Sequence, residues 1–199
     1  MVDIDVRLGL TPADLQLREL QTKRPDEWID LNPDDSAELR LVQEHFPGSI
    51  ISSRLFRDEK TLLVKKESIV GISLLLRNSP ETNYNYLSDV TCLDRLDFMQ
   101  EDEHRFEVIY NLYSMGTFQR FRLKAAVSED DPTIETVEGI WAAANWNERE
   151  IYDMFGITFK NHSDLRRILM PDDWVGHPLR KDFPIGGEEV EFSHNVRDR

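Results

Sequence analysis

Carboxylates, arginines and histidines gather in the last third of the chain, beginning with the segment NEREIYDMFGITF at residues 147–159. Closely spaced carboxylates are typical of general acid–base catalysis, in which one group donates a proton and another accepts one. Glu148 and Glu150 are the nearest such pair, but residues two apart on a helix point to different sides. The segment therefore does not predict an acid–base pair.

A metal-dependent hydrolase is an alternative interpretation of this region, with ligands drawn from loops. The candidate ligands are His162, Asp164, Asp172, Asp173 and His177. The two histidines lack the close spacing of motifs such as H-E-x-x-H. No serine or cysteine shows the sequence context of an activated nucleophile. This alternative requires a stoichiometric metal ion in the purified chain.

Glu148 interrupts an apolar stripe of a helix that we predict from about Thr136 to Phe155, with Gly156 in the position that follows the last helical turn. The apolar members of the stripe are Val137, Trp141, Ala144, Ile151 and Phe155. A carboxylate on an apolar face must find a positive partner or bind a proton. We therefore predict that Glu148 anchors an arginine from the C-terminal tail or from another subunit.

Two simpler interpretations compete with that prediction. If the helix is half exposed, Glu148 is solvated and needs no partner. Arg149 and Asp153, four residues apart, would then form only a surface pair, of about 0.3–0.5 kcal/mol.

The charge of the chain excludes several classes of partner. Its 38 acidic and 24 basic residues give a formal net charge of −14. Such a chain repels phosphate backbones and anionic lipid, so we expect neither nucleic acid nor a membrane surface as a direct partner. No apolar stretch approaches the roughly 20 residues of a transmembrane helix, and the N-terminus does not resemble a secretory signal, so we expect a cytoplasmic location.

Cysteine and glycine usage argues against a resident cofactor. Cys92 is the only cysteine, and we expect it to be a small core residue. An iron–sulfur cluster needs about four thiolates, and the chain contains neither G-x-G-x-x-G nor G-x-x-x-x-G-K. We therefore expect no cluster or nucleotide in this chain alone.

Hydrophobic periodicity predicts an α+β fold with two layers, a mainly antiparallel sheet with helices on one face and an extended C-terminal tail. The clearest signal is the period-two alternation of 105–115 and 120–127 on either side of Gly116, which predicts an antiparallel hairpin. Further helices are expected at 36–46 and 67–78, and further strands at 49–56, 61–66 and 84–93.

Three regions follow from this pattern. Residues 1–35 are expected to form an adapter with one short helix beginning near Thr11-Pro12. Residues 36–156 form the α+β body. Residues 157–199 carry aromatic and aliphatic side chains on irregular, proline-containing chain. We predict that this last region cannot bury itself and becomes ordered as a docking tail on a partner.

The residues of the last two regions resemble a known family. ANWNEREIYDMFGITF, followed by HSDLRRILMPDDWVGHPLRKDFP, is similar to the signature of the 30-kilodalton subunit, also called the C subunit, of respiratory complex I. The similarity covers about residues 36–184. Asn161-His162-Ser163 departs from it, because the family usually has Gly-His-Pro there. We expect subunit docking at Trp146, Glu148, Arg149, Glu150, Asp153, Phe155, Gly156, Phe159, His162, Arg166, Arg167, Trp174, His177, Arg180, Asp182 and Phe183.

The resemblance implies a non-catalytic subunit of a proton-translocating NADH:quinone oxidoreductase. In that family this subunit holds no flavin, cluster or quinone, although the complex uses FMN, iron–sulfur clusters, NADH and quinone. It lies in the peripheral arm on the cytoplasmic side, next to the quinone-site subunit and the cluster-bearing subunits. It touches the membrane only through the complex. The same role in an F420H2 or ferredoxin dehydrogenase, or in a membrane-bound hydrogenase, is the alternative.

Overall fold

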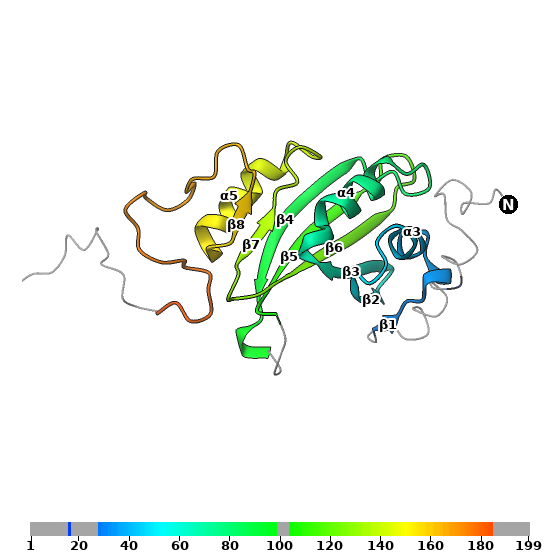
Figure 1. Ribbon diagram of the computed structural model, residues 1–199, viewed down its shortest axis with the longest axis horizontal. Coiled ribbons are helices and arrows are strands. Elements are labelled where there is room, and N and C mark those ends of the chain that lie inside the picture. The colour runs from blue at the N-terminus through cyan, green and yellow to red at the C-terminus, as the bar shows by residue number, and fades with distance from the viewer. Residues whose placement is uncertain (1–15, 17–27, 99–103, 185–199) are drawn as a thin grey trace, which may run out of the picture.

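A six-stranded mixed sheet forms the centre of the molecule in the computed structural model, which describes residues 16, 28–98 and 104–184 (Figure 1). Its strand order is β1-β2-β3-β6-β5-β4. All neighbouring pairs are antiparallel except β3 and β6, which are parallel. The strands are β1 (Ile29–Asp30), β2 (Ile50–Phe56), β3 (Glu59–Lys65), β4 (Tyr86–Asp94), β5 (Phe106–Tyr113) and β6 (Arg120–Val127).

Helices α3 (Ala37–His45) and α4 (Ile69–Asn78) cover one face of this sheet. The alternation predicted for the β5–β6 hairpin is present, because every second residue of each strand is buried. These residues join the buried side chains of the two helices in one hydrophobic core. The predicted α+β class, two layers and mainly antiparallel sheet are confirmed. Short 3-10 helices lie at Pro33–Asp35, Lys66–Ser68 and Leu96–Phe98.

The last helix, α5 (Ala144–Phe155), is shorter than its sequence predicts. The predicted start near Thr136 is wrong, because Thr133–Glu135 forms strand β7, which pairs in parallel with β8 (Thr158–Lys160). Val137 and Trp141 are buried as expected, but they sit in turns before the helix. Their helical spacing with Ile151 is therefore a coincidence, because they belong to a different element that packs into the same core.

The ends of the body differ from the expected boundaries. Strand β1 pairs with β2, so part of the segment expected to be an adapter belongs to the sheet. Of the short helix expected near Thr11-Pro12, only Gln16 is among the described residues, and it is helical. At the other end of the molecule, α5 lies beside the chain that follows it, far from α3 (Figure 1). Within the described ranges, no helix is both long and apolar enough to cross a membrane.

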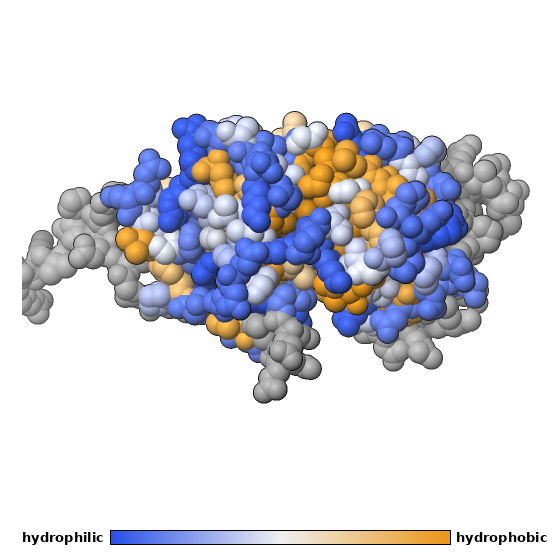
Figure 2. All heavy atoms as spheres, viewed as in Figure 1, coloured by the Kyte–Doolittle hydropathy of each residue, from blue (hydrophilic) through white to orange (hydrophobic). Residues whose placement is uncertain are grey.

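The surface is divided between apolar and polar areas. On the face shown in Figure 2, hydrophobic residues gather over α4 and the strands behind it. Leu74 of α4 is 41% exposed. The side of the molecule that carries α5 is mostly hydrophilic in the same view.

Gly156 ends α5 in the left-handed conformation, with φ of 74°, as the sequence predicted. A Cβ atom there would lie 2.5 Å from Nε2 of His177 and 2.9 Å from a terminal nitrogen of Arg180. We expect Gly156→Ala to lower the free energy of unfolding by about 1–3 kcal/mol, because both the backbone and the packed chain must shift. Chemical denaturation of the purified chain measures this.

Gly139→Ala is the matched control, because a Cβ at Gly139 meets nothing within 4 Å. Its effect is expected to stay within about 0.5 kcal/mol. Equal losses in the two variants would contradict the assigned role of Gly156.

Candidate docking site around helix α5

The carboxylate of Asp153 organises the chain that follows α5. Its Oδ2 accepts hydrogen bonds from the backbone N–H groups of Ile168, Leu169 and Met170 at 3.0, 2.8 and 2.9 Å. Its Oδ1 lies 2.5 Å from Nη1 of Arg167, and the side chain is fully buried. Burial alone would raise the pKa of Asp153, but these donors together hold the pKa below its usual value. Asp153 is therefore a buried carboxylate that stays ionised.

Arg167 extends this network along the chain. Its Nη2 donates to the carbonyl oxygens of Trp174 and Gly176, at 3.0 and 3.2 Å. Nδ1 of His177 lies 2.9 Å from the carbonyl oxygen of Asp153. Both ends of the 167–177 loop are thus held against the C-terminal turn of α5.

Arg149 has a different partner from the one considered for it. Its Nε and Nη2 donate to the carbonyl oxygens of Arg166 and Arg167, at 3.2 and 3.1 Å. Its guanidinium also lies over the ring of Trp146, 5.1 Å from the centroid. The interpretation of Arg149 and Asp153 as a surface pair is therefore wrong, because both side chains are buried by the chain after α5 and bind it separately.

A second buried arginine holds the end of the described chain. Arg105 is only 1% exposed in its side chain and contacts Asp94 through Nε and Nη2, at 3.1 and 2.9 Å. It also binds both carboxylate oxygens of Asp182, at 2.6 and 3.2 Å. Nearby, the backbone N–H of Lys181 donates to Asp94, and Nε of Arg180 donates to the carbonyl oxygen of Phe155 at 2.6 Å.

These contacts correct the prediction that the chain after Gly156 cannot bury itself. Among the described residues, 157–184 are bound to the body at Asp153, at Arg149 and at Arg105. Phe159 is also buried in the core, and Phe183 packs on Gly176. The prediction failed because it counted apolar residues only, whereas polar contacts hold most of this segment. Residues 185–199 lie outside the described ranges.

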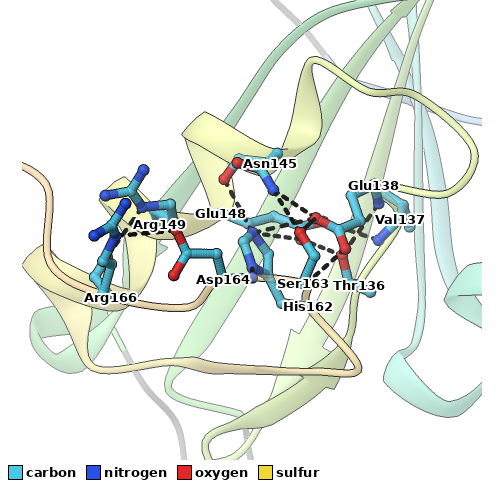
Figure 3. Close-up of polar contacts among 10 residues, drawn as sticks. All are labelled: Thr136, Val137, Glu138, Asn145, Glu148, Arg149, His162, Ser163, Asp164 and Arg166. Carbon is cyan, nitrogen blue, oxygen red and sulfur yellow. Dashed lines mark hydrogen bonds and ion pairs between the residues drawn. The ribbon is translucent and has the colours of Figure 1, made fainter.

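Glu148 lies in a separate polar cluster on the same helix (Figure 3). Its side chain is fully buried, and its oxygens accept hydrogen bonds from the Thr136 hydroxyl and, at 2.9 Å, from the Val137 N–H. No described arginine contacts it. Within the described chain the predicted arginine partner is not found, and the solvated alternative is wrong. A local cap of the turn before α5 takes the place that an ion pair was expected to fill.

His162 completes this cluster without supplying a positive charge. The N–H of Asp164 donates to its Nδ1 at 3.0 Å, so that nitrogen carries no proton. Its Nε2 then donates to the carbonyl oxygen of Asn145 at 3.1 Å. This pattern assigns a neutral imidazole, although Nε2 is 4.0 Å from Glu148 and 3.6 Å from Glu138.

The environment of Glu148 favours its protonated form. Burial raises the pKa of Glu148 to about 7, against the lowering effect of the hydrogen bonds from Thr136 and Val137. The negative charge of Glu138 raises it further. In the neutral form, a proton on Glu148 can be donated to the Thr136 hydroxyl, which itself accepts from the N–H of Glu138.

The remaining residues expected to dock are divided between the core and the surface. Phe155 and Phe159 are core residues, and Trp174 is half buried. Glu150 and Arg166 are exposed, and Trp146 is 62% exposed. The structure therefore brings together Asp153, Arg167 and His177, and separately Glu148 and His162, but not the whole set.

The ligands of the alternative hydrolase are not brought together. His162 faces Asn145 and Glu138, whereas His177 contacts the backbone of Asp153. In the described part of the chain, no group of three or more His, Cys, Asp or Glu residues is placed to hold a metal ion. Cys92 is a buried core residue, as expected, and burial raises the pKa of its thiol.

Sequence reasoning missed Arg105, Asp94, Thr136 and Glu138. Arg105 meets Asp182 across 77 positions of sequence, and no local pattern marks such a pair. Asp94 is the last residue of β4 and pairs with Phe106, the residue that follows Arg105, so the two side chains lie at adjoining ends of two strands that the sequence did predict. An arginine and an aspartate at facing strand ends were the available signal.

The fold and this site define an α+β domain whose buried charged side chains hold its own C-terminal segment. Residues 62–189 match the family described as respiratory-chain NADH dehydrogenase, 30 Kd subunit. The chain belongs to this family, as its sequence motifs indicated.

Individual relatives agree with that assignment. A protein of Geotalea uraniireducens (strain Rf4), named as the C subunit of NADH-quinone oxidoreductase, is 49% identical over 81% of this chain and 94% of its own length. A protein of Roseiflexus sp. (strain RS-1) with the same name is 43% identical over 81% of this chain and 91% of its own.

A solved structure shares the fold. A chain in the structure of the membrane-bound sulfane sulfur reductase, an archaeal respiratory membrane complex, aligns with a TM-score of 0.59 and 22% identity. The alignment covers 74% of this chain and 84% of that one.

We expect Asp153→Asn to destabilise the protein by about 3–5 kcal/mol, because it leaves Arg167 without its buried counter-ion. Trypsin should then cleave after Arg166 and Arg167 faster than in the unchanged protein. Because the pKa of Asp153 is lowered in the folded state, its stabilisation is present above the ordinary value of 3.8 and is lost as the pH falls below it.

Asp164→Asn is the control for this variant. The Asp164–Arg166 pair is exposed on both sides, so the change should cost less than about 1 kcal/mol. Denaturation curves and time courses of proteolysis compare the two. If Asp153→Asn behaved like the control, the organising role of Asp153 would be wrong.

We expect Glu148→Gln to stabilise the protein at alkaline pH and to leave it unchanged at acid pH. The folded-state pKa of about 7 lies above the ordinary 4.5, so the unfolded state loses its proton first and stability falls as the pH rises between these values. Glutamine has the shape of the neutral acid, with an amide that can donate to Thr136. The variant should therefore be more stable by about 3 kcal/mol at pH 8 and equal near pH 4.

Denaturation at several pH values measures this difference. Glu150→Gln, two residues away and exposed, should show no such pH-dependent gain. A Glu148→Gln variant that is less stable than the unchanged protein at pH 8 would mean that the carboxylate form is required.

Proposed function

We propose that this chain is a structural subunit, without a cofactor of its own, in the peripheral arm of a proton-translocating NADH:quinone oxidoreductase. It would lie on the cytoplasmic side of the membrane and support the quinone-site subunit and the cluster-bearing subunits. FMN, iron–sulfur clusters, NADH and quinone would be bound by other chains. Membership of the 30-kilodalton subunit family and the relatives named as the C subunit of NADH-quinone oxidoreductase support this assignment.

One observation about the structure carries the structural part of the proposal. The charged side chains around α5 make their hydrogen bonds and ion pairs with the segment 165–183. That chain leaves large apolar side chains facing outward. Leu169, Val175 and Leu179 are 61%, 88% and 51% exposed. The charged groups therefore hold an apolar surface in place, which is the arrangement that a docking subunit requires.

The bound segment reduces the cost of association. A chain that becomes ordered only on its partner loses conformational entropy at that moment, which weakens binding. Here Asp153 and Arg105 order the segment beforehand, so its exposed side chains meet a partner from a fixed position. A rigid subunit of this kind would keep its neighbours, and the redox centres they hold, at a constant separation.

A related respiratory complex with another electron donor is the second candidate. The archaeal sulfane sulfur reductase contains a chain of this fold, so the fold also occurs in a respiratory membrane complex that is named for a different reaction. The relatives at 43–49% identity carry the NADH-quinone name, which favours NADH as the donor.

The test is co-purification of the tagged full-length chain from gently solubilised membranes. We expect Val175→Asp with Leu179→Asp to lower recovery of the other subunits by about tenfold, because two exposed apolar contacts are replaced by charge. The melting temperature should change little, since neither side chain is buried. Ile51→Asp, at a residue 47% exposed on β2, is the control and should leave recovery unchanged.

Normal recovery with the double variant would contradict docking through the segment. Removal of residues 157–199 is a less specific test, because it also takes the buried Phe159 out of the core.

A further inference from the structure

The face of the sheet that α3 and α4 leave open carries a polar pocket. Its volume is about 480 Å³. The polar residues that line it come from four strands or their ends: Glu59, Ser88, Asn111, Tyr113, Arg120 and Arg122. Their register confirms a common face, because Asn111 pairs with Arg122 and Tyr113 with Arg120 across β5 and β6. The pocket is thus built on the central hairpin of the fold.

The two arginines of the pocket are in different states. Arg122 is fixed, because it lies 2.6 Å from Glu59 and its Nε donates to Asn111 at 3.2 Å. Arg120 is exposed, and its guanidinium has no hydrogen bond or ion pair with any other described residue. Of these two cations, one is therefore neutralised and the other is free, in a chain whose formal net charge is −14.

Aromatic and sulfur-containing side chains continue this surface to the end of the hairpin. Tyr86 is 47% exposed and pairs with Tyr113 on the neighbouring strand. In the hairpin turn, Met115 and Phe118 are 55% and 60% exposed. Tyrosine, phenylalanine, methionine and arginine are the residue types enriched at the centres of protein interfaces, where lysine and acidic residues are depleted.

Two irregular backbone conformations, a β-bulge and a residue with positive φ, occur in this surface, and both are less favourable than regular strand geometry. The register of β4 and β5 shifts between Leu87 and Asp89, so Ser88 is an extra, bulged residue directed at the pocket. Phe118 has φ of 58°, the left-handed region that a bulky side chain seldom adopts. Glycine or asparagine would fit that position with less strain, so an exposed phenylalanine there suggests a role other than folding.

We propose that this surface, formed by Tyr86, Tyr113, Met115, Phe118 and Arg120 around the pocket, is a second docking surface that binds an acidic segment of another subunit. A glutamate or aspartate of that segment would pair with Arg120 inside the pocket. Ser88 and Tyr113 line the same space. Flanking apolar side chains of the partner would cover the aromatic residues. The positive charge of Arg120 on an acidic chain selects the sign of the partner.

The proposal uses membership of a multi-subunit family but does not depend on docking through the C-terminal segment. The two surfaces are tested by different variants. A complex that survives Val175→Asp with Leu179→Asp would leave this proposal untouched, and the reverse also holds.

The experiment is photo-cross-linking in the assembled membrane complex, with p-benzoylphenylalanine in place of Phe118 in the full-length chain. Mass spectrometry of the product identifies the peptide attached. We expect a peptide of a different subunit that contains Asp or Glu. Adding Arg120→Glu should lower the yield by about tenfold without changing the melting temperature of the chain. Lys65→Glu, at an exposed position on β3 with the same change of charge, should keep the yield within about twofold.

Three results would overturn the proposal. The first is a cross-link only to this chain or to a second copy of it, and the second is the absence of any product. The third is an unchanged yield with Arg120→Glu, which would show that the contact does not use the charge.

Discussion

The buried Asp153 carboxylate needs hydrogen-bond donors, and this constraint determines how the chain after α5 is held. An ionised carboxylate inside a protein must have donors on both oxygens. All of the donors to this one come from the chain after α5: three consecutive backbone N–H groups and the guanidinium of Arg167. Helix α5 and the segment that follows it are therefore a single structural unit, because neither satisfies its polar groups without the other.

The same helix meets the problem of a buried carboxylate in two opposite ways. Asp153 keeps its charge because an arginine and three amides surround it, and its pKa is lowered. Glu148, five residues earlier, has one hydroxyl, one amide and a neutral histidine nearby, and burial raises its pKa to about 7. The number of donors decides between these outcomes, and burial alone does not. Buried ion pairs contribute little net stability but define one arrangement, and Asp153 and Arg105 define the path of the segment.

This arrangement accounts for how a small acidic domain can present surfaces to several neighbours. The polar groups that would be candidates for catalysis face inward and bind the chain itself. Large apolar side chains are among the groups that face outward: Trp146, Leu169, Val175 and Leu179 near α5, and Met115 and Phe118 at the hairpin turn. Under the proposed function, these side chains would contact other subunits of a respiratory complex.

The sequence by itself determined the α+β class, the β5–β6 hairpin, the end of α5 at Gly156 and the family. These follow from local periodicity, turn chemistry and a long contiguous motif, all of which can be read within a short stretch of chain. It did not determine the start of α5, because Val137 and Trp141 occupy helical spacing by chance and only the pairing of β7 with β8 shows that they belong to turns. Nor did it assign the partners of Glu148, Asp153 and Arg105. Arg105 and Asp182 are 77 residues apart in the sequence. A carboxylate binds whichever hydrogen-bond donors the folded chain brings within about 3 Å. Only the tertiary structure therefore decided which charge is paired and which is neutralised.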